Sequence, residues 1–263
     1  GDARRATEIG SGKPAEIGSI EKMSKSKKNL VDPDDIIQHW GADCARWFML
    51  SDSPPERDVI WTETGVAGAG RFIQRIWRLM GEIEVKAAPK DAPRPADFGE
   101  EAQELRRAAH KSLDAVGRNI EALRFNVAVA QLYELSNALT AALAKQGAGL
   151  DWALREAIEH LVQMIGPMMP HLAEECWARL GYNTLLADQP WPQAEAALLV
   201  DDRVTIAVQV NGKRRDELTV ARSASKEEIE TAALKLEGVV RAIEGRPVKK
   251  VIVVPQRIVN VVA

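Results

Sequence analysis

Cysteine is scarce in this sequence, with only Cys44 and Cys176 among 263 residues. Neither belongs to a CxxC pair, which excludes a disulfide framework and a cysteine-based zinc motif. Both lie in apolar, helix-like stretches, and we expect buried free thiols in a reducing compartment. The histidines are equally few: His39, His110, His160 and His171. Their spacing matches no metal-ligand pattern, so we expect no metal site and in particular no zinc.

Long hydrophobic runs are also missing. No apolar segment approaches the ~20 residues that a membrane-spanning helix needs. The polar N-terminus lacks the apolar core of a signal peptide. We therefore expect a cytoplasmic protein without a membrane partner. The apolar fraction of 46% is nevertheless ample for the cores of one large domain or two to three small ones.

The net charge of −3 gives no whole-chain sign of nucleic-acid binding, but the charge is unevenly distributed. Residues 1–30 carry seven Lys and Arg against four Asp and Glu, and residues 201–263 carry twelve against nine. Each end is therefore positive by three charges, on an acidic middle. Basic ends on an acidic body fit a protein that touches phosphates at selected places.

The N-terminal pattern is a loop followed by two short helices. Residues 1–30 are rich in glycine and lysine and predict a loop. Asp32-Pro33 provides an N-cap and a proline at the first helical position, which starts a helix that Gly41 ends. A second helix is expected over residues 42–50, stopped by Pro54-Pro55.

The middle of the chain shows apolar residues at steps of three and four, the period of amphipathic helices. Helices are expected from about residue 62, over roughly 98–123, from about Asn126 to the glycines at 147 and 149, and on to about Leu180. A proline-rich linker covers 86–97. The stripes are Val66, Ala69, Ile73, Ile76 and Met80; Ala128, Leu132, Leu135, Leu139 and Ala142; and Leu154, Ile158, Leu161, Ile165 and Met168. These helices predict a bundle.

After Pro190-Trp191-Pro192 the period changes to two. Val204, Ile206, Val208 and Val210 predict a strand, and Asn211-Gly212 predicts a hairpin turn. A two-residue loop would place Leu218 and Val220 on the face opposite Val204 and Ile206. We therefore expect a three-residue loop with a glycine bulge. Ser225 starts a helix through a capping box, and strands follow at Val248–Val254 and Ile258–Val262.

The sharpest local motif is Lys22-Met23-Ser24-Lys25-Ser26. Two ammonium groups on a flexible loop with serines can fold over a triphosphate and offset the charge that develops during nucleotidyl transfer. Lysine suits this task because it is a compact point charge on a mobile stem. The alternative is a lysine-rich surface loop or a basic localisation patch, because Lys27 and Lys28 follow.

With its surroundings, this KMSKS motif resembles the class I aminoacyl-tRNA synthetases. The resemblance covers nearly the whole chain and is strongest to the leucyl enzymes. It rests on Lys27-Lys28-Asn29, Gly41-Ala42-Asp43, Arg46, Ser53-Pro54, Trp61, Gly65-Val66, Gly68, Arg71-Phe72, Arg75, Trp77, Phe125-Asn126, Pro167, Pro170-His171, Glu174, Trp177, Val208-Gln209-Val210-Asn211-Gly212-Lys213 and Arg215.

The resemblance implies ATP-dependent activation of leucine, with Mg²⁺, and transfer of the leucyl group to tRNA(Leu) by a monomer. Lys25 matches the lysine that contacts ATP in the family, with Lys22 beside it. Ser24 and Ser26 shape the loop, and Met23 is expected to pack it against the protein. No HIGH-type motif occurs in the 263 residues. The resemblance therefore implies a truncated enzyme that is inactive alone.

Two sets of cations are candidate tRNA contacts. Arg71, Arg75 and Arg78 form a basic stripe on the expected helix from residue 62, and the alternative is a solvated face paired with Glu82. Lys213, Arg214 and Arg215 follow the hairpin turn, and the alternative is neutralisation by Asp216 and Glu217. The resemblance favours tRNA contact for both sets.

The expected fold is mainly α, in three parts. Residues 1–61 are the tail of a nucleotide-binding α/β catalytic domain, and residues 62–192 are a helical bundle of the anticodon-binding type. Residues 200–263 are a small α+β domain that contacts tRNA. The alternatives are part of an isoleucyl, valyl or methionyl synthetase, or a free-standing tRNA-binding module. The lack of a cysteine-based zinc module and of a terminal coiled coil disfavours the first.

Overall fold

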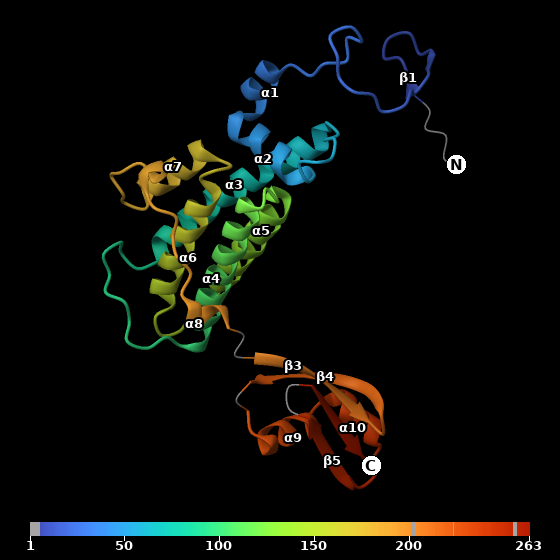
Figure 1. Cartoon of the computed structure of the whole chain (residues 1–263), viewed down its shortest axis with the longest axis vertical. Helices are drawn as coiled ribbons and strands as arrows, with labels where there is room; N and C mark the ends of the chain where they lie inside the picture. Colours follow the sequence, from blue (N-terminus) through green and yellow to red (C-terminus); the bar gives the residue numbers. More distant parts are fainter. Residues whose placement is uncertain (1–5, 201–202, 223, 255–256) are drawn as a thin grey trace.

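The N-terminal arm and two short helices precede the main body of the chain. The structure, a computed structural model, describes residues 6–200, 203–222, 224–254 and 257–263. In the arm, β1 (Ala6–Thr7) pairs antiparallel with β2 (Pro14–Ala15), a short pairing inside the segment predicted as loop. Two helices follow, α1 (Pro33–Trp40) and α2 (Ala42–Asp52), and Figure 1 shows the arm extending away from the bundle beyond α1.

The boundaries of α1 confirm the sequence signals. The side chain of Asp32 accepts a hydrogen bond from the backbone N–H of Asp34 at 3.0 Å, and Pro33 occupies the first turn. Gly41 then takes a positive φ of 85°, which separates α1 from α2. No residue of α1 is buried, whereas α2 buries Cys44, Trp47 and Phe48 in the bundle core.

The central helices form the predicted bundle. They are α3 (Glu63–Lys86), α4 (Glu100–Glu121), α5 (Phe125–Ala142), α6 (Leu150–Ile165) and α7 (Pro170–Arg179), followed by the 3₁₀ turn η1 (Leu186–Asp188) and α8 (Ala196–Leu199). Helices α4, α5 and α6 pack against one another, α3 packs on α6 and α7, and α2 packs on α3 and α5 (Figure 1).

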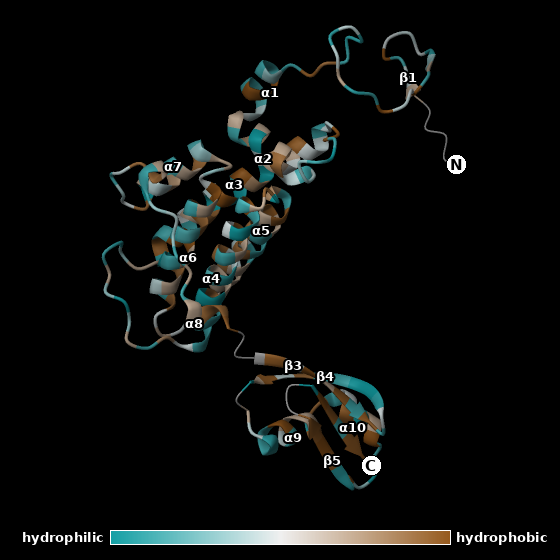
Figure 2. Ribbon diagram, in the orientation of Figure 1, coloured by the Kyte–Doolittle hydropathy of each residue, from teal (hydrophilic) through white to brown (hydrophobic). Residues whose placement is uncertain are grey.

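The predicted apolar stripes line the core of this bundle. Every stripe residue is buried except Ile73, which is partly buried against the same core. Figure 2 shows the exposed faces of these helices carrying hydrophilic residues. One boundary differs from the prediction: α5 ends at Ala142, and Gly149, with a φ of 70°, directly precedes α6. Of the described helices, none combines the length and apolar character that a bilayer crossing requires.

The C-terminal domain is a four-stranded sheet covered by two helices. Its elements are β3 (Arg203–Val210), β4 (Lys213–Ala221), α9 (Lys226–Leu234), α10 (Glu237–Ile243), β5 (Lys250–Val254) and β6 (Ile258–Val262). The strand order is β4-β3-β6-β5, with β3 and β6 parallel and the other pairs antiparallel. Ile206, Val208, Ile229, Val239 and Val259 belong to a core separate from that of the bundle.

The hairpin register corrects one prediction. Val210 pairs with Lys213, so the loop is the two residues Asn211 and Gly212, both with positive φ, and not three. Val208 pairs with Asp216 and Gln209 with Arg214, which leaves Arg215 as an extra residue in β4. This bulge restores the parity, so that Leu218 lies opposite Ile206 on the core face. One extra residue was needed to bring these side chains to the same face, as predicted, but it lies in β4 and not in the loop.

Candidate functional site

The KMSKS residues form a compact turn between β2 and α1. The backbone N–H of Ser24 donates to Oδ1 of Asn29 at 2.8 Å, and the Nδ2 amide of Asn29 donates to the carbonyl of Lys22 at 3.4 Å. The hydroxyls of Ser24 and Ser26 lie 3.3 Å apart. The backbone N–H of Lys28 donates to the carbonyl of Lys25 at 3.2 Å, and Lys28 has a φ of 52°. The serines and Asn29 therefore hold the loop shape.

The lysines of this loop differ in their surroundings. Lys27 forms an ion pair with Glu21 at 2.7 Å. Lys22 and Lys25 are exposed, and within the described residues neither ammonium group has an ion-pair partner. Met23 is 41% exposed, and the expectation that it packs the loop against the protein stays a prediction for the full-length enzyme. Among the described residues, the first member of the helical core along the chain is Cys44, which comes after the loop.

The basic stripe on α3 has two kinds of member. Arg75 donates through Nη2 to Oδ1 of Asn137 at 2.6 Å, which ties α3 to α5. Arg71 and Arg78 are exposed, and no ion pair engages either of them in the part of the chain that the structure describes. The predicted alternative, pairing with Glu82, is likewise not among the described ion pairs. Arg71 and Arg78 are thus the two cations of this stripe that are available to a phosphate.

The hairpin tip is anchored to the end of the chain. Asn211 donates through Nδ2 to the carbonyl of Ala263 at 3.3 Å and accepts from its N–H at 3.2 Å. The N–H of Gly212 donates to Oδ1 of Asn260 at 3.0 Å. These contacts tie the turn, which directly precedes the three cations, to β6 and to the residue after it.

The acidic neighbours of the tip do not neutralise all three cations. Glu217 pairs with Arg214. Asp216 instead turns to the start of α10, where Oδ2 accepts from the N–H of Gly238 at 3.0 Å. A Cβ at position 238 would lie only 2.5 Å from the carbonyl oxygen of Arg215, so glycine is required for this close approach. Among the described residues, Lys213 and Arg215 have no ion-pair partner.

Several residues quoted for the family resemblance hold the fold together. Asp43 of α2 accepts from the backbone N–H of Leu172 at 2.8 Å, in the first turn of α7, and pairs with Arg46 at 3.1 Å. Glu174 accepts from the N–H groups of Leu186 and Ala187 at 2.8 and 3.0 Å. These carboxylates are therefore caps that join separate segments.

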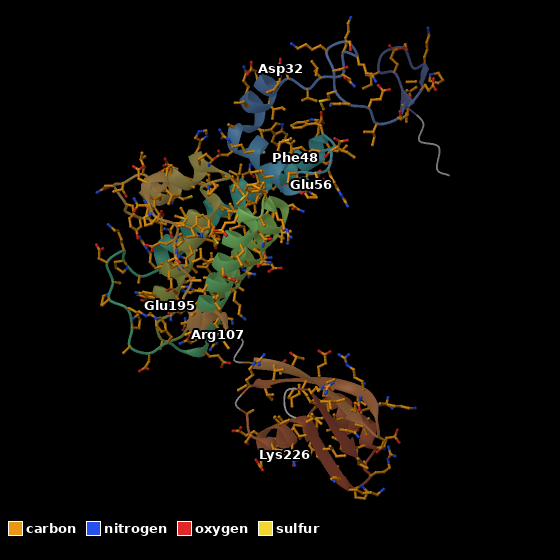
Figure 3. All side chains as sticks on the ribbon, in the orientation of Figure 1. Asp32, Phe48, Glu56, Arg107, Glu195 and Lys226 are labelled. Atoms are coloured by element: carbon orange, nitrogen blue, oxygen red, sulfur yellow. The ribbon has the colours of Figure 1, made fainter. Side chains whose placement is uncertain are left out.

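A buried polar cluster between α4 and α6 was missed by the sequence analysis. Arg106, whose side chain is 2% exposed, donates to Glu156 at 2.8 and 3.2 Å and to Glu195 at 2.8 Å. Burial alone would raise the pKa of Glu156, but His110 and Arg106 lower it to about 2. Arg94 forms a bidentate pair with Glu195, labelled in Figure 3, at 2.6 and 3.0 Å. The signal was Arg106 and His110, four residues apart among buried positions of α4.

His110, Glu156 and His160 lie close enough together to suggest a metal site, with ligand atoms within 4.8 Å. The hydrogen bonds argue against that role. Nδ1 of His110 accepts from the N–H of Glu195 at 3.1 Å, so the ring's proton is on Nε2, 3.3 Å from Glu156. A metal-bound histidine needs a bare nitrogen toward the metal and a proton on the other. The cluster fits an internal ion-pair network.

Comparison with known proteins accounts for these features together. Residues 102–231 match the family model described as the anticodon-binding domain of tRNA ligase. Residues 17–62, which contain the KMSKS loop, match the model for class I tRNA synthetases of the I, L, M and V group. These two matches assign the loop and helices α4 to α7 to the synthetases, without choosing among the four amino acids.

The relatives make that choice. Leucine–tRNA ligases of Rhodopseudomonas palustris (strain BisB5) and Parvibaculum lavamentivorans are 58% and 59% identical to this chain, over 100% and 98% of its length. The chain belongs to the leucine–tRNA ligase family. It spans about 31% and 30% of the length of these two relatives.

A solved structure agrees with this placement. The chain resembles the LeuRS of a ternary complex from Agrobacterium radiobacter K84, described as agnB2 LeuRS–tRNA–LeuAMS, with a TM-score of 0.71 and 29% identity. The match covers 92% of this chain and 31% of that one. The predicted fold, a helical bundle followed by a small α+β domain, is confirmed by this likeness and by the family match.

Proposed function

We propose that this chain supplies the ATP loop and the tRNA-binding surface of a leucine–tRNA ligase. The observation that carries the proposal is the 58% identity to such a ligase over the whole chain. We divide the chain as the sequence does, into residues 1–61 with the ATP loop, residues 62–192 as the tRNA-binding bundle, and residues 200–263 as a second tRNA-contacting domain. The ligase works as a monomer in the cytoplasm, where translation uses its product.

The ATP-binding role falls on the KMSKS loop. Lys25 and Lys22 are exposed without ion-pair partners among the described residues, so their charges are free to meet the triphosphate of ATP, which is used as its Mg²⁺ complex. Attack of the leucine carboxylate on the α-phosphorus expels pyrophosphate and leaves leucyl-adenylate. The two ammonium groups stabilise the charge that builds on the departing pyrophosphate. Ser24, Ser26 and Asn29 keep the loop in shape.

The tRNA-binding role falls on two separate cationic sets. Arg71 and Arg78 lie on α3, with Arg75 partly engaged by α5, and Lys213 and Arg215 lie at the hairpin tip beside the paired Arg214. Cations on the bundle and on the terminal domain suit a ligand with a long phosphate backbone. Such contacts recognise the shape and backbone of a folded RNA, and its unpaired bases.

The proposal is tested by the binding of RNA to the 263-residue chain. We expect tRNA(Leu) to bind at least about tenfold more tightly than an unstructured RNA of equal length, because folded shape is recognised in addition to charge. Fluorescence anisotropy at fixed salt gives both affinities. Equal affinity for the two RNAs, or no binding of tRNA(Leu), would overturn the proposal.

A further inference from the structure

We propose that a cleft between α1 and α3 binds one unpaired nucleotide of the tRNA, with its base on Trp40 and its phosphate on Arg71. The inference rests on the proposed function and adds a site to it. The cleft has a volume of about 370 Å³ and is lined by His39 and Trp40 from α1 and by Gly70 and Arg71 from α3. That volume falls in the range of about 300–1,000 Å³ that is typical of small-ligand sites.

Trp40 is held in place but remains largely open. A Cβ at Gly70 would lie 3.4 and 3.5 Å from Cε3 and Cζ3 of Trp40, so the indole rests on bare backbone of α3. The residue is nevertheless 44% exposed, and no ring or cation–π contact engages it within the described chain. Trp77, also on α3 and 41% exposed, instead has the guanidinium of Arg179 at 4.3 Å over its ring. Trp40 thus offers an aromatic face that Trp77 does not.

Arg71 and His39 supply polar groups at the same cleft. The guanidinium of Arg71 folds along α3 toward Gly68, where Nη2 lies 3.6 Å from the position of an added Cβ. Arg71 is exposed and has no ion-pair partner among the described residues. Nδ1 of His39 lies 2.6 Å from the carbonyl oxygen of Asp35 and donates to it, which leaves Nε2 for a ligand. Among the described residues, no carboxylate lines the cleft.

An aromatic face beside one guanidinium matches a nucleotide within an RNA chain. Any of the four bases can stack on the indole of Trp40, and a single phosphodiester carries the one negative charge that Arg71 can meet. A free triphosphate would call for several cations, as on the KMSKS loop. The base must be unpaired, because a base inside a helix presents no free face to the protein. The cleft is formed by α1, which follows the KMSKS loop in the chain, and by α3, which carries the basic stripe.

The test measures binding of tRNA(Leu) to the 263-residue chain across a range of salt concentrations. Trp40→Leu should weaken binding about 5- to 150-fold, the loss typical of one stacked base, without changing the salt slope. Trp40→Phe should restore affinity to within about threefold. Arg71→Gln should reduce the slope of log K against log salt by about 0.7 to 0.9, because one phosphate contact is lost. Trp77→Leu is the matched control and should leave both quantities unchanged.

Chemical probing of the 2′-hydroxyls locates the nucleotide. One unpaired position should be protected in the complex with the parent chain and reactive in the complex with Trp40→Leu. If Trp40→Leu leaves affinity and protection unchanged while tRNA(Leu) still binds, the cleft is not a nucleotide site, whereas the proposed function stands. No binding by the parent overturns both. Should Trp40→Leu unfold the chain, Arg71→Gln decides the question, since its side chain is exposed: an unchanged slope overturns the site.

Discussion

The carboxylate of Asp43 in α2 accepts a hydrogen bond from the backbone N–H of Leu172, 129 residues later, at 2.8 Å. Asp43 is buried, and its other oxygen pairs with Arg46 at 3.1 Å. The contact satisfies a free N–H in the first turn of α7 and places a negative charge at that helix's positive end. One aspartate therefore joins α2, in the segment that follows the KMSKS loop, to the last long helix of the bundle.

Replacement of Asp43 should destabilise this junction. We expect Asp43→Ala to lower the free energy of unfolding by about 1–3 kcal/mol, because a helix cap is lost and a buried N–H is left without a partner. Asp43→Asn keeps an acceptor for Leu172 and should lose less. Urea unfolding followed by circular dichroism measures both. An alanine variant as stable as the parent would show that the contact contributes nothing.

The pKa of Glu156 predicts a pH dependence of stability. Its folded pKa of about 2 lies below its usual 4.5, so its ion pairs stabilise the fold above pH 4.5, and this stability is lost as pH falls toward 2. The contribution is up to about 3 kcal/mol. Glu156→Gln resembles the protonated glutamate, so parent and variant should differ at pH 6 and converge near pH 2.

The exposed pair of Arg118 and Asp114, at 2.6 Å, provides the control for Glu156. Asp114→Asn should change stability by less than about 0.5 kcal/mol at pH 6, because solvent screens the pair. If Glu156→Gln shows no larger loss than Asp114→Asn, the buried network does not stabilise the bundle as described.

Lys25 should matter for chemistry and not for stability. In a full-length ligase that contains this chain, we expect Lys25→Ala to slow leucine-dependent pyrophosphate exchange by about two to three powers of ten, a typical loss for one transition-state contact. Lys27→Ala is the matched control, because Lys27 is already paired with Glu21. Similar rates of pyrophosphate exchange for the parent and Lys25→Ala would show that this lysine takes no part in the reaction.

The 263-residue chain alone should not form leucyl-adenylate. It contains no HIGH-type motif, and the KMSKS loop by itself supplies only part of the positioned groups that the reaction needs. Leucine-dependent pyrophosphate exchange by the purified chain, measured against a leucine-free blank, is expected at background level. Exchange above that blank would contradict the division of roles proposed here.

The fold was predictable where a pattern repeats and less so where a single contact decides. The stripe from Ala128 to Ala142 predicted a buried helix face because helical period alone places those residues together. The sequence also predicted that an odd residue was needed in the hairpin, but it did not show that the bulge lies at Arg215, where Gly238 approaches from α10. Helix α10 was missed for the same reason: Asp216, from another element, caps its start.

Some features of the candidate site could likewise be predicted from the sequence, and others required the structure. The KMSKS residues were recognised from a contiguous motif, and the structure adds the turn that shapes them. Only the structure shows which cations are already engaged. Arg75 has its partner on the neighbouring helix α5, and Arg214 is paired with a glutamate three residues further along β4. The cluster around Arg106 could not be recognised without the structure, because the two carboxylates that bind it come 50 and 89 residues later in the sequence.

The salt dependence of tRNA(Leu) binding to the chain, with and without Lys213 and Arg215, tests the central claim most directly. These are the hairpin-tip cations without an ion-pair partner among the described residues. The double variant Lys213→Ala, Arg215→Ala should weaken binding and flatten the slope of log K against log salt by up to about two. Arg214→Ala should have a smaller effect, since Glu217 already neutralises that charge. If affinity and slope both survive the double substitution, the terminal domain does not hold tRNA through this hairpin.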